Sequence, residues 1–295
     1  MLSSFEIYFP QSAIRNPQSA IRNPQSATRN PQPATPTKKP IPMRSFIFSL
    51  LLVALPLFAF AQTDQQQIDL DGARAVHIYA AFSSVEVLTG GQGQVSVEHD
   101  LMVDGEDREE LRKLSIERSN GILTIRELRP TAETLKREFP HKSGNTITSG
   151  RKGGEGTFNG ILLDATLKVI VPAGIKVTVE TEYGGIRVVN VAGLVSARAK
   201  YGAVDVIYEE GTAISAIELY SNYGAVDVTL PAGEPVDLHL VTEYGELLTD
   251  LTIDMDTDAS KEKEFYQRVV GKIGKGGAKV SCEAPYGNVY LRQGE

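Results

Sequence analysis

Tryptophan is absent from this sequence, cysteine occurs once and histidine occurs four times. A single cysteine excludes an internal disulfide bond. Cys282 stands at an apolar position of an alternating run. That position favours a buried, inert thiol over a nucleophile, because a reactive thiol needs exposure and a positive neighbourhood. The lack of tryptophan removes one residue type that commonly stacks on sugar rings.

Motifs for catalysis and metal binding are missing as well. There is no His-x-x-x-His pattern, no paired cysteine and no Gly-x-Ser-x-Gly elbow. Aspartate and glutamate are numerous, but none stands out from a solvated face. We therefore expect no catalytic residue, no cofactor, no metal and no enzymatic activity. The scattered histidines are His77, His99, His141 and His239.

Two segments at the N-terminus do not resemble a folded domain. Residues 1–42 repeat Asn-Pro-Gln and lack any core-forming periodicity, which indicates a disordered tail or an over-extended reading frame. Residues 43–61 contain Arg44, an apolar run and a final Ala-Phe-Ala. This pattern predicts a signal peptide cleaved before Gln62, and hence export to the periplasm, the outer surface or the medium. The alternative is an uncleaved membrane anchor.

The remaining chain, 62–295, is acidic. Residues 1–61 hold 6 of the 30 Lys and Arg and 1 of the 37 Asp and Glu, so 24 positive and 36 negative side chains remain, a net charge of −12. An acidic surface argues against nucleic acid and anionic lipid as partners. A cell-surface glycan or an envelope protein remains a candidate partner.

One short phrase, Tyr-Gly-x-aliphatic, occurs five times in the second half of the chain. The steps between its tyrosines are 18, 22, 21 and 42, the last being twice 21. A period near 20 with β-type residues predicts a stacked β-repeat. We interpret each Tyr-Gly as a structural corner. The corner residues are Tyr183, Gly184, Tyr201, Gly202, Tyr223, Gly224, Tyr244, Gly245, Tyr286 and Gly287.

Around each tyrosine the apolar positions alternate with polar ones, which is the pattern of a strand with one buried face. The glycine interrupts this alternation, as expected at a bend, a bulge or a residue with positive φ. Each repeat should therefore form strand, corner, strand and loop, with successive repeats stacked directly on one another. The inward positions six residues before the tyrosines are Val177, Val195, Ile217, Leu238 and Val280.

Weaker copies and interruptions flank the regular array. A degenerate copy at 76–87 has Phe82 and Ser83 in place of Tyr-Gly, and Asn120-Gly121 resembles a second. Residues 107–113 are the one stretch with helical character. Residues 128–160 predict a long mobile loop, and 252–278 a charged insertion with an added strand. These patterns predict a single all-β domain over 62–295: a β-solenoid, or flattened two-sheet parallel β-helix, with a β-sandwich as the alternative.

These columns, the Val-Pro-Ala-Gly at 171–174 and the Gly-Gly-Ala-Lys-Val at 276–280 resemble the bacterial putative-adhesin family, whose members carry the label domain of unknown function 4097. The resemblance spans roughly 68–293 and implies an adhesin-like β-solenoid on secreted or envelope proteins. The family's corner has a polar residue, Gly, Asp and an aliphatic residue. Here tyrosine replaces the polar residue, and the aspartate is replaced by Gly185, Ala203, Ala225, Glu246 and Asn288.

The tyrosine column admits two interpretations. A row of exposed rings would suit a sugar-binding platform, whereas rings pointing inward would form part of the core. Tyr201 and Tyr223 share the parity of the inward positions, so the sequence predicts that they are buried. Four residues after the tyrosines, Arg187 and Asp205 should pair on the surface, while Asp205 and Asp227 supply far fewer oxygens than calcium needs.

The sequence favours a secreted or envelope protein without enzymatic activity, which presents an extended surface for adhesion or assembly. Two alternatives belong to other classes. One is a glycan-active enzyme on a β-helix scaffold, and the other is a periplasmic sensor or partner of a membrane complex. Carboxylates gathered with Arg or Lys in one groove would favour the enzyme.

Overall fold

A computed structural model describes residues 65–138, 154–158 and 161–294, which all belong to one compact unit, Phe58–Glu295. No helix of this described part is long and apolar enough to cross a bilayer. Several sequence predictions lie outside the described residues: the leader 1–42, the signal peptide 43–61, cleavage before Gln62, His141, and segments 139–153 and 159–160 of the predicted loop.

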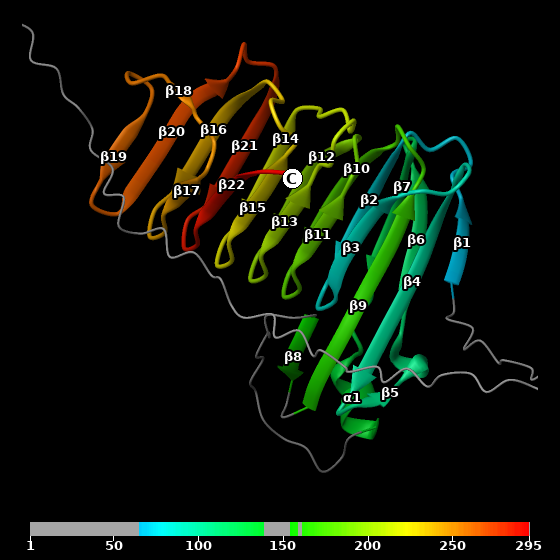
Figure 1. The fold of residues 1–295 in the computed structure, drawn as a ribbon. Coiled ribbons are helices and arrows are strands. Elements are labelled where there is room, and N and C mark those ends of the chain that lie inside the picture. Colours follow the sequence, from blue (N-terminus) through cyan, green and yellow to red (C-terminus); the bar gives the residue numbers. More distant parts are fainter. Residues whose placement is uncertain (1–64, 139–153, 159–160, 295) are drawn as a thin grey trace, which may run out of the picture. The chain divides into compact units, whose positions relative to one another are not determined.

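Two mixed sheets make up the fold (Figure 1). In spatial order the first sheet contains β1 (Gln65–Asp69), β4 (Gln94–Val103), β9 (Ile161–Val171), β3 (Ser84–Thr89), β11 (Ile186–Val189), β13 (Val204–Ile207), β15 (Val226–Leu230), β22 (Val289–Gln293) and β17 (Leu247–Thr249), with β5 (Glu106–Asp107) and β8 (Gly154–Phe158) beside β4 and β9. The second contains β18 (Asp254–Met255), β20 (Tyr266–Ile273), β16 (Val236–Thr242), β21 (Ala278–Ala284), β14 (Ile217–Ser221), β12 (Leu194–Ala199), β10 (Lys176–Thr181), β2 (Ala75–Ala80), β7 (Ile122–Glu127) and β6 (Leu114–Ser119), with β19 (Lys261–Lys263) beside β20.

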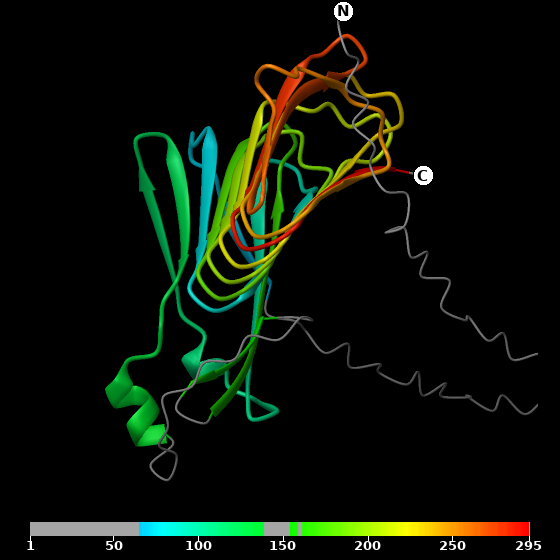
Figure 2. The ribbon, with the colours of Figure 1, turned by 90° about the vertical axis from the view of Figure 1, so that its left-hand side faces the viewer.

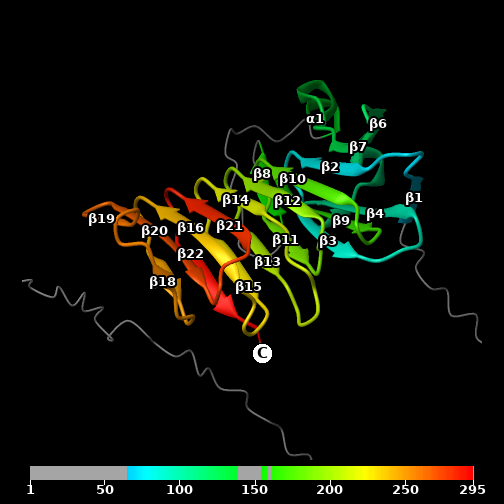
Figure 3. The same cartoon turned by 90° about the horizontal axis from the view of Figure 1, so that it is seen from above.

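Each repeat contributes one strand to each sheet. The chain runs along the second sheet, turns at the Tyr-Gly corner and returns along the first, so that one repeat is one coil of a flattened parallel β-helix (Figures 2 and 3). Equivalent residues pair in register, as Ile186 does with Val204 and Val204 with Val226. The predicted all-β solenoid is confirmed.

The order of the coils differs from the order of the repeats. The first three stack in sequence, but the last repeat lies between the third and the fourth, with β21 between β14 and β16 and β22 between β15 and β17. The prediction that successive repeats stack directly is therefore wrong at this end. The reason is the insertion 252–278: its strand β20 pairs antiparallel with the outer edge of β16, so the last repeat joins the inner side.

At the N-terminal end of the array, antiparallel strands are again added outside the parallel coils. Strands β7 and β9 form a coil outside β2 and β3. Antiparallel β4 and then β1 extend the first sheet beyond β9, and antiparallel β6 ends the second sheet. Asn120-Gly121 is not a corner. Both residues have positive φ, 53° and 75°, and they form the hairpin turn between β6 and β7.

The α-helix of the described residues does not form where the sequence predicted helical character. Within 107–113 only one 3₁₀ turn forms, Glu109–Leu111, because Glu106–Asp107 pairs with β4. The α-helix α1 (Ala132–Glu138) lies inside the predicted loop. It follows Pro130, and the hydroxyl of Thr131 accepts a hydrogen bond from the Thr134 N–H at 3.1 Å, which caps its N-terminus.

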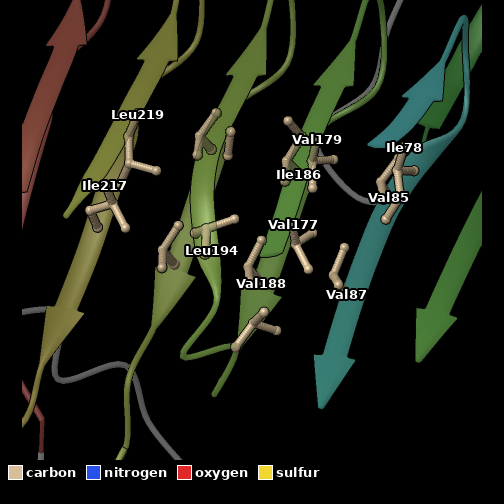
Figure 4. Packing of buried hydrophobic residues seen from close by; sticks show 14 of the residues in the cluster. Ile78, Val85, Val87, Val177, Val179, Ile186, Val188, Leu194, Ile217 and Leu219 are labelled. Carbon is tan, nitrogen blue, oxygen red and sulfur yellow. The ribbon is translucent and has the colours of Figure 1, made fainter. Parts of the chain in front are cut away.

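Aliphatic side chains from both sheets fill the space between them (Figure 4). The predicted inward positions are buried with one exception, Val195, which is 41% exposed. The pairing of β10 with β12 shifts register there: Val177 lies opposite Leu194 and Thr178 opposite Ser196, so Val195 is extruded in a bulge and Leu194 takes its place in the core. Cys282 is fully buried, as predicted.

Candidate functional site

Each of the five Tyr-Gly pairs lies between the end of a second-sheet strand and the start of a first-sheet strand. The tyrosine rings, however, are not in the core. Tyr201, Tyr223, Tyr286 and Tyr244 are 39% to 61% exposed, and Tyr183 is half-buried. The inward prediction fails because the second-sheet strands end two residues before each tyrosine, so strand parity no longer fixes the direction of the side chain.

The five rings form one continuous stack along the corners. Neighbouring rings are nearly parallel, with centroids 5.1 to 5.2 Å apart and interplanar angles of 2° to 16°. This spacing is set by adjacent parallel strands, which lie about 4.8 Å apart. We call this row the tyrosine ladder; in spatial order it is Tyr183, Tyr201, Tyr223, Tyr286 and Tyr244.

Both ends of the ladder are covered. The guanidinium carbon of Arg129 lies 5.7 Å from the ring centroid of Tyr183, and the Phe265 ring lies 5.7 Å from that of Tyr244, tilted by 32°. Each of the five rings thus has a neighbour over both faces. The surface left exposed consists mainly of ring edges and hydroxyls, and none of the five hydroxyls hydrogen-bonds to another described residue.

Covered ring faces bear directly on the sugar-platform interpretation. Stacking of a sugar requires an open aromatic face, and the ladder has none. What it offers is a narrow apolar edge with a regular row of hydroxyls, each able to donate and to accept a hydrogen bond.

Close backbone contact holds the corners in place. A Cβ at any of the five corner glycines would come well within 3.0 Å of a backbone carbonyl of the adjacent coil. None of these glycines has a positive φ, so the positive-φ explanation is wrong and close approach alone requires glycine. The affected glycines are Gly184, Gly202, Gly224, Gly245 and Gly287.

Hydroxyls two residues before the tyrosine support the same corners. The Thr181 hydroxyl donates to the Gly184 carbonyl at 2.6 Å, and that of Ser221 donates to the Gly202 carbonyl at 2.7 Å. Thr242 does the same with the Gly287 carbonyl at 2.8 Å. These side chains are buried, so the ladder rests on a rigid base.

The degenerate corner at Phe82-Ser83 is not part of the ladder. Phe82 packs against a second small core that includes Leu101 and Leu163. The next coil outward has no Tyr-Gly corner between β7, which ends at Glu127, and β9, which begins at Ile161. The side chain of Glu127 lies beside Ser83 instead.

That space holds a buried polar cluster. One carboxylate oxygen of Glu127 accepts hydrogen bonds from the N–H groups of Ala81, Phe82 and Ser83, at 2.7, 2.9 and 3.1 Å. The other accepts from the Ser83 hydroxyl and lies 3.1 Å from His99 Nε2. Burial raises the pKa of Glu127, but the hydrogen bonds from His99, Phe82 and Ser83 outweigh it and hold the pKa below its ordinary value.

The geometry of this cluster fits a structural role and not that of a catalytic triad. Ser83 lies 3.4 Å from the same His99 nitrogen that faces Glu127, so the imidazole does not relay between serine and carboxylate. All three side chains are buried. Sequence spacing gave no hint of the grouping, apart from the serine at a glycine position.

The remaining candidates lie on solvated faces. Arg187 and Asp205 form the predicted surface ion pair, and Arg292 binds both carboxylate oxygens of Asp227 at 2.8 and 3.0 Å. Burial, partly offset by Arg187, raises the pKa of Asp205. Within the described ranges no three His, Cys, Asp or Glu side chains gather into a metal-binding group.

Comparison with known proteins adds little beyond this geometry. No family model matches the sequence, and no curated protein matches it. A solved structure of a putative cell adhesion protein from Clostridium sporogenes aligns with a TM-score of 0.48 and 12% identity, over 78% of this chain and 99% of that one. Membership of the family that the sequence resembles stays a prediction.

Proposed function

We propose that this chain is an exported, non-enzymatic β-solenoid that presents the tyrosine ladder as an extended surface for adhesion or assembly. The observation that carries the proposal is the exposure of the ladder. Of nine exposed large hydrophobic side chains in the described ranges, four belong to the ladder and a fifth, Phe265, covers its end. Five of the nine exposed large hydrophobic side chains of the described ranges therefore lie in one row.

Such a row is unusual on a surface that only faces water. Contiguous exposed apolar patches mark interaction sites, and tyrosine is enriched at protein interfaces. The ladder is also preorganised, since each ring is held between two neighbours and each corner glycine is packed against the next coil. A partner would therefore cost little ordering entropy on this side of the interface.

Export and the absence of catalysis are parts of the same proposal. The basis for export is the segment 43–61, with its positive start, apolar run and small-residue end. The basis for a non-enzymatic role is the character of the exposed site, which is a row of ring edges and hydroxyls with solvated charges but, among the described residues, no cleft or catalytic motif beside it.

A binding screen against glycans and bacterial envelope extracts tests the proposal. The wild-type chain should bind, and the double variant Tyr201→Ser with Tyr223→Ser should lose that binding. The matched control is Val195→Ser, which removes an exposed apolar side chain from the second sheet and should bind like the wild type. Binding that survives the double variant, no binding at all by the wild type, or release of cleaved glycan would each contradict the proposal.

A further inference from the structure

The two ends of the ladder differ in charge. At the Tyr183 end, Arg129 lies over the first ring and the ammonium of Lys200 lies 5.1 Å from the centroid of the second. At the Tyr244 end Glu243 and Glu246 flank the tyrosine in the sequence, and both are exposed. Lys263 and Glu264, which precede the covering Phe265, are also exposed, but their charges are opposite and cancel.

The charges at the first end are partly balanced. Glu182 forms ion pairs with Arg129 and with Lys200, the latter at 3.9 Å, so one carboxylate serves two cations. Glu243 and Glu246 have no ion-pair partner among the described residues. The ladder therefore runs from a net positive end to a net negative end.

We infer that two copies of this chain bind each other ladder against ladder, in antiparallel orientation. This rests on the proposed function, in which the ladder is a binding surface. A two-fold axis beside Tyr223, the middle ring, would place Tyr183 of each copy opposite Tyr244 of the other. The acidic end of one copy then faces the basic end of its partner at both ends of the contact. Parallel pairing would bring like charges together.

The geometry of the ladder fits a second copy better than another polymer. Its rungs repeat every 5.1 to 5.2 Å, and an identical ladder has the same repeat, so all five rungs meet a rung. An extended peptide advances about 3.3 Å per residue and falls out of step within a few rungs. A row of identical hydroxyls is also self-complementary, because each hydroxyl both donates and accepts.

Short side chains beside the ladder leave room for the ladder of a second copy to come close. In the neighbouring row toward the first sheet, Gly185, Ala203 and Ala225 lie beside the first three rings and carry nothing larger than a methyl group. Asn288 and Glu246 lie beside the last two rings. The rings are only about half exposed, and a full aromatic side chain buries about 150–250 Å². The contact is therefore smaller than the roughly 800 Å² per partner of a stable complex, and the pairing is a weak, reversible one.

Variants that reverse the charge at one end of the ladder test the inference. One variant, Glu243→Lys with Glu246→Lys, makes both ends of the ladder basic; the other, Lys200→Glu, makes both ends acidic. Sedimentation velocity of the purified exported chain, from about 1 to about 500 µM, should show a reversible dimer, and each variant alone should dimerise at least about tenfold more weakly. An equimolar mixture of the two should recover the wild-type affinity, since opposite ladders then meet.

Several results would overturn the inference. The inference is wrong if the chain stays monomeric over the whole concentration range. It is also wrong if both variants dimerise as tightly as the wild type, because the interface then lies elsewhere, such as the open edge of β17. Tyr223→Ser should also abolish the dimer, with Val195→Ser as the unaffected control. If Tyr201→Ser with Tyr223→Ser loses binding to glycan or envelope material while the wild type is monomeric, the proposed function stands and only the self-pairing fails. Circular dichroism of each variant confirms folding.

Discussion

The ring of Tyr223 stacks on that of Tyr286, with centroids 5.2 Å apart, and not on that of Tyr244, the next tyrosine of the repeat. The last repeat has entered the array between the third and the fourth, and the ladder stays continuous through the exchange. Every coil of the ladder therefore places a tyrosine ring at the equivalent corner position, whatever the order of the repeats in the chain.

Exposure of the ladder sets the stability cost of losing one ring. Tyr223→Ala should cost about 1 to 3 kcal/mol, the sum of two stacking contacts of about 0.5–1.5 kcal/mol each. Tyr208→Ala, at a side chain only 1% exposed, should cost about 3–5 kcal/mol. Urea denaturation of both variants measures the difference, and equal losses would show that Tyr223 is a core residue after all.

The corner glycines should tolerate no side chain. Gly224→Ala should destabilise the fold by about 1–3 kcal/mol, because its Cβ would collide with the backbone of Gly202 and the coils would have to separate. Ala203→Ser, at an exposed position beside the corner, is the control and should change stability by less than about 0.5 kcal/mol. The explanation from close approach is wrong if the two variants unfold at the same denaturant concentration.

Glu127 should make the fold sensitive to acid. Its pKa is lowered in the folded state, so its contribution to stability is complete above the unfolded pKa of about 4.3 and is lost as the pH falls through the folded pKa. Glu127→Gln should lower stability near pH 7 by about 3 kcal/mol and should lose less stability than the wild type as the pH falls below about 4.3. Glu210→Gln, at an exposed carboxylate, is the control, and identical pH profiles for wild type and Glu127→Gln would refute the role.

The thiol of Cys282 should be unreactive in the folded chain. Burial raises the pKa of its thiol to about 12, and the side chain is fully buried. Thiol reagents at pH 8 should label it only at the rate of unfolding, and at full speed in denaturant. Rapid labelling of the native chain would contradict this prediction, since β21 lies between β14 and β16 and its thiol is fully buried there.

The sequence predicts the architecture well because the fold is made of repeated local patterns. Alternation gives the strands, the glycine gives the corner, and a period near 20 gives the coil. Its failures occur where those patterns stop. The tyrosines lie past the strand ends, Val195 lies in a bulge, and the order of the coils depends on an insertion that pairs with β16.

The polar cluster could not be predicted for a related reason. Ser83, His99 and Glu127 come from a corner and two strands that neither the repeat nor any motif relates. The one visible signal was a serine where the repeat has glycine. That substitution indicated a missing neighbour at the corner, but not what fills the space.

Chemical modification of tyrosine tests the central claim most directly. The dilute chain should be nitrated readily at Tyr201, Tyr223, Tyr286 and Tyr244 and not at Tyr208, and binding to the retained glycan or envelope material, or to a second copy at high concentration, should protect the four ladder residues. Mass spectrometry reads each site. If the four resist nitration as Tyr208 does in the dilute chain, or if binding leaves their modification unchanged, the ladder is not the binding surface.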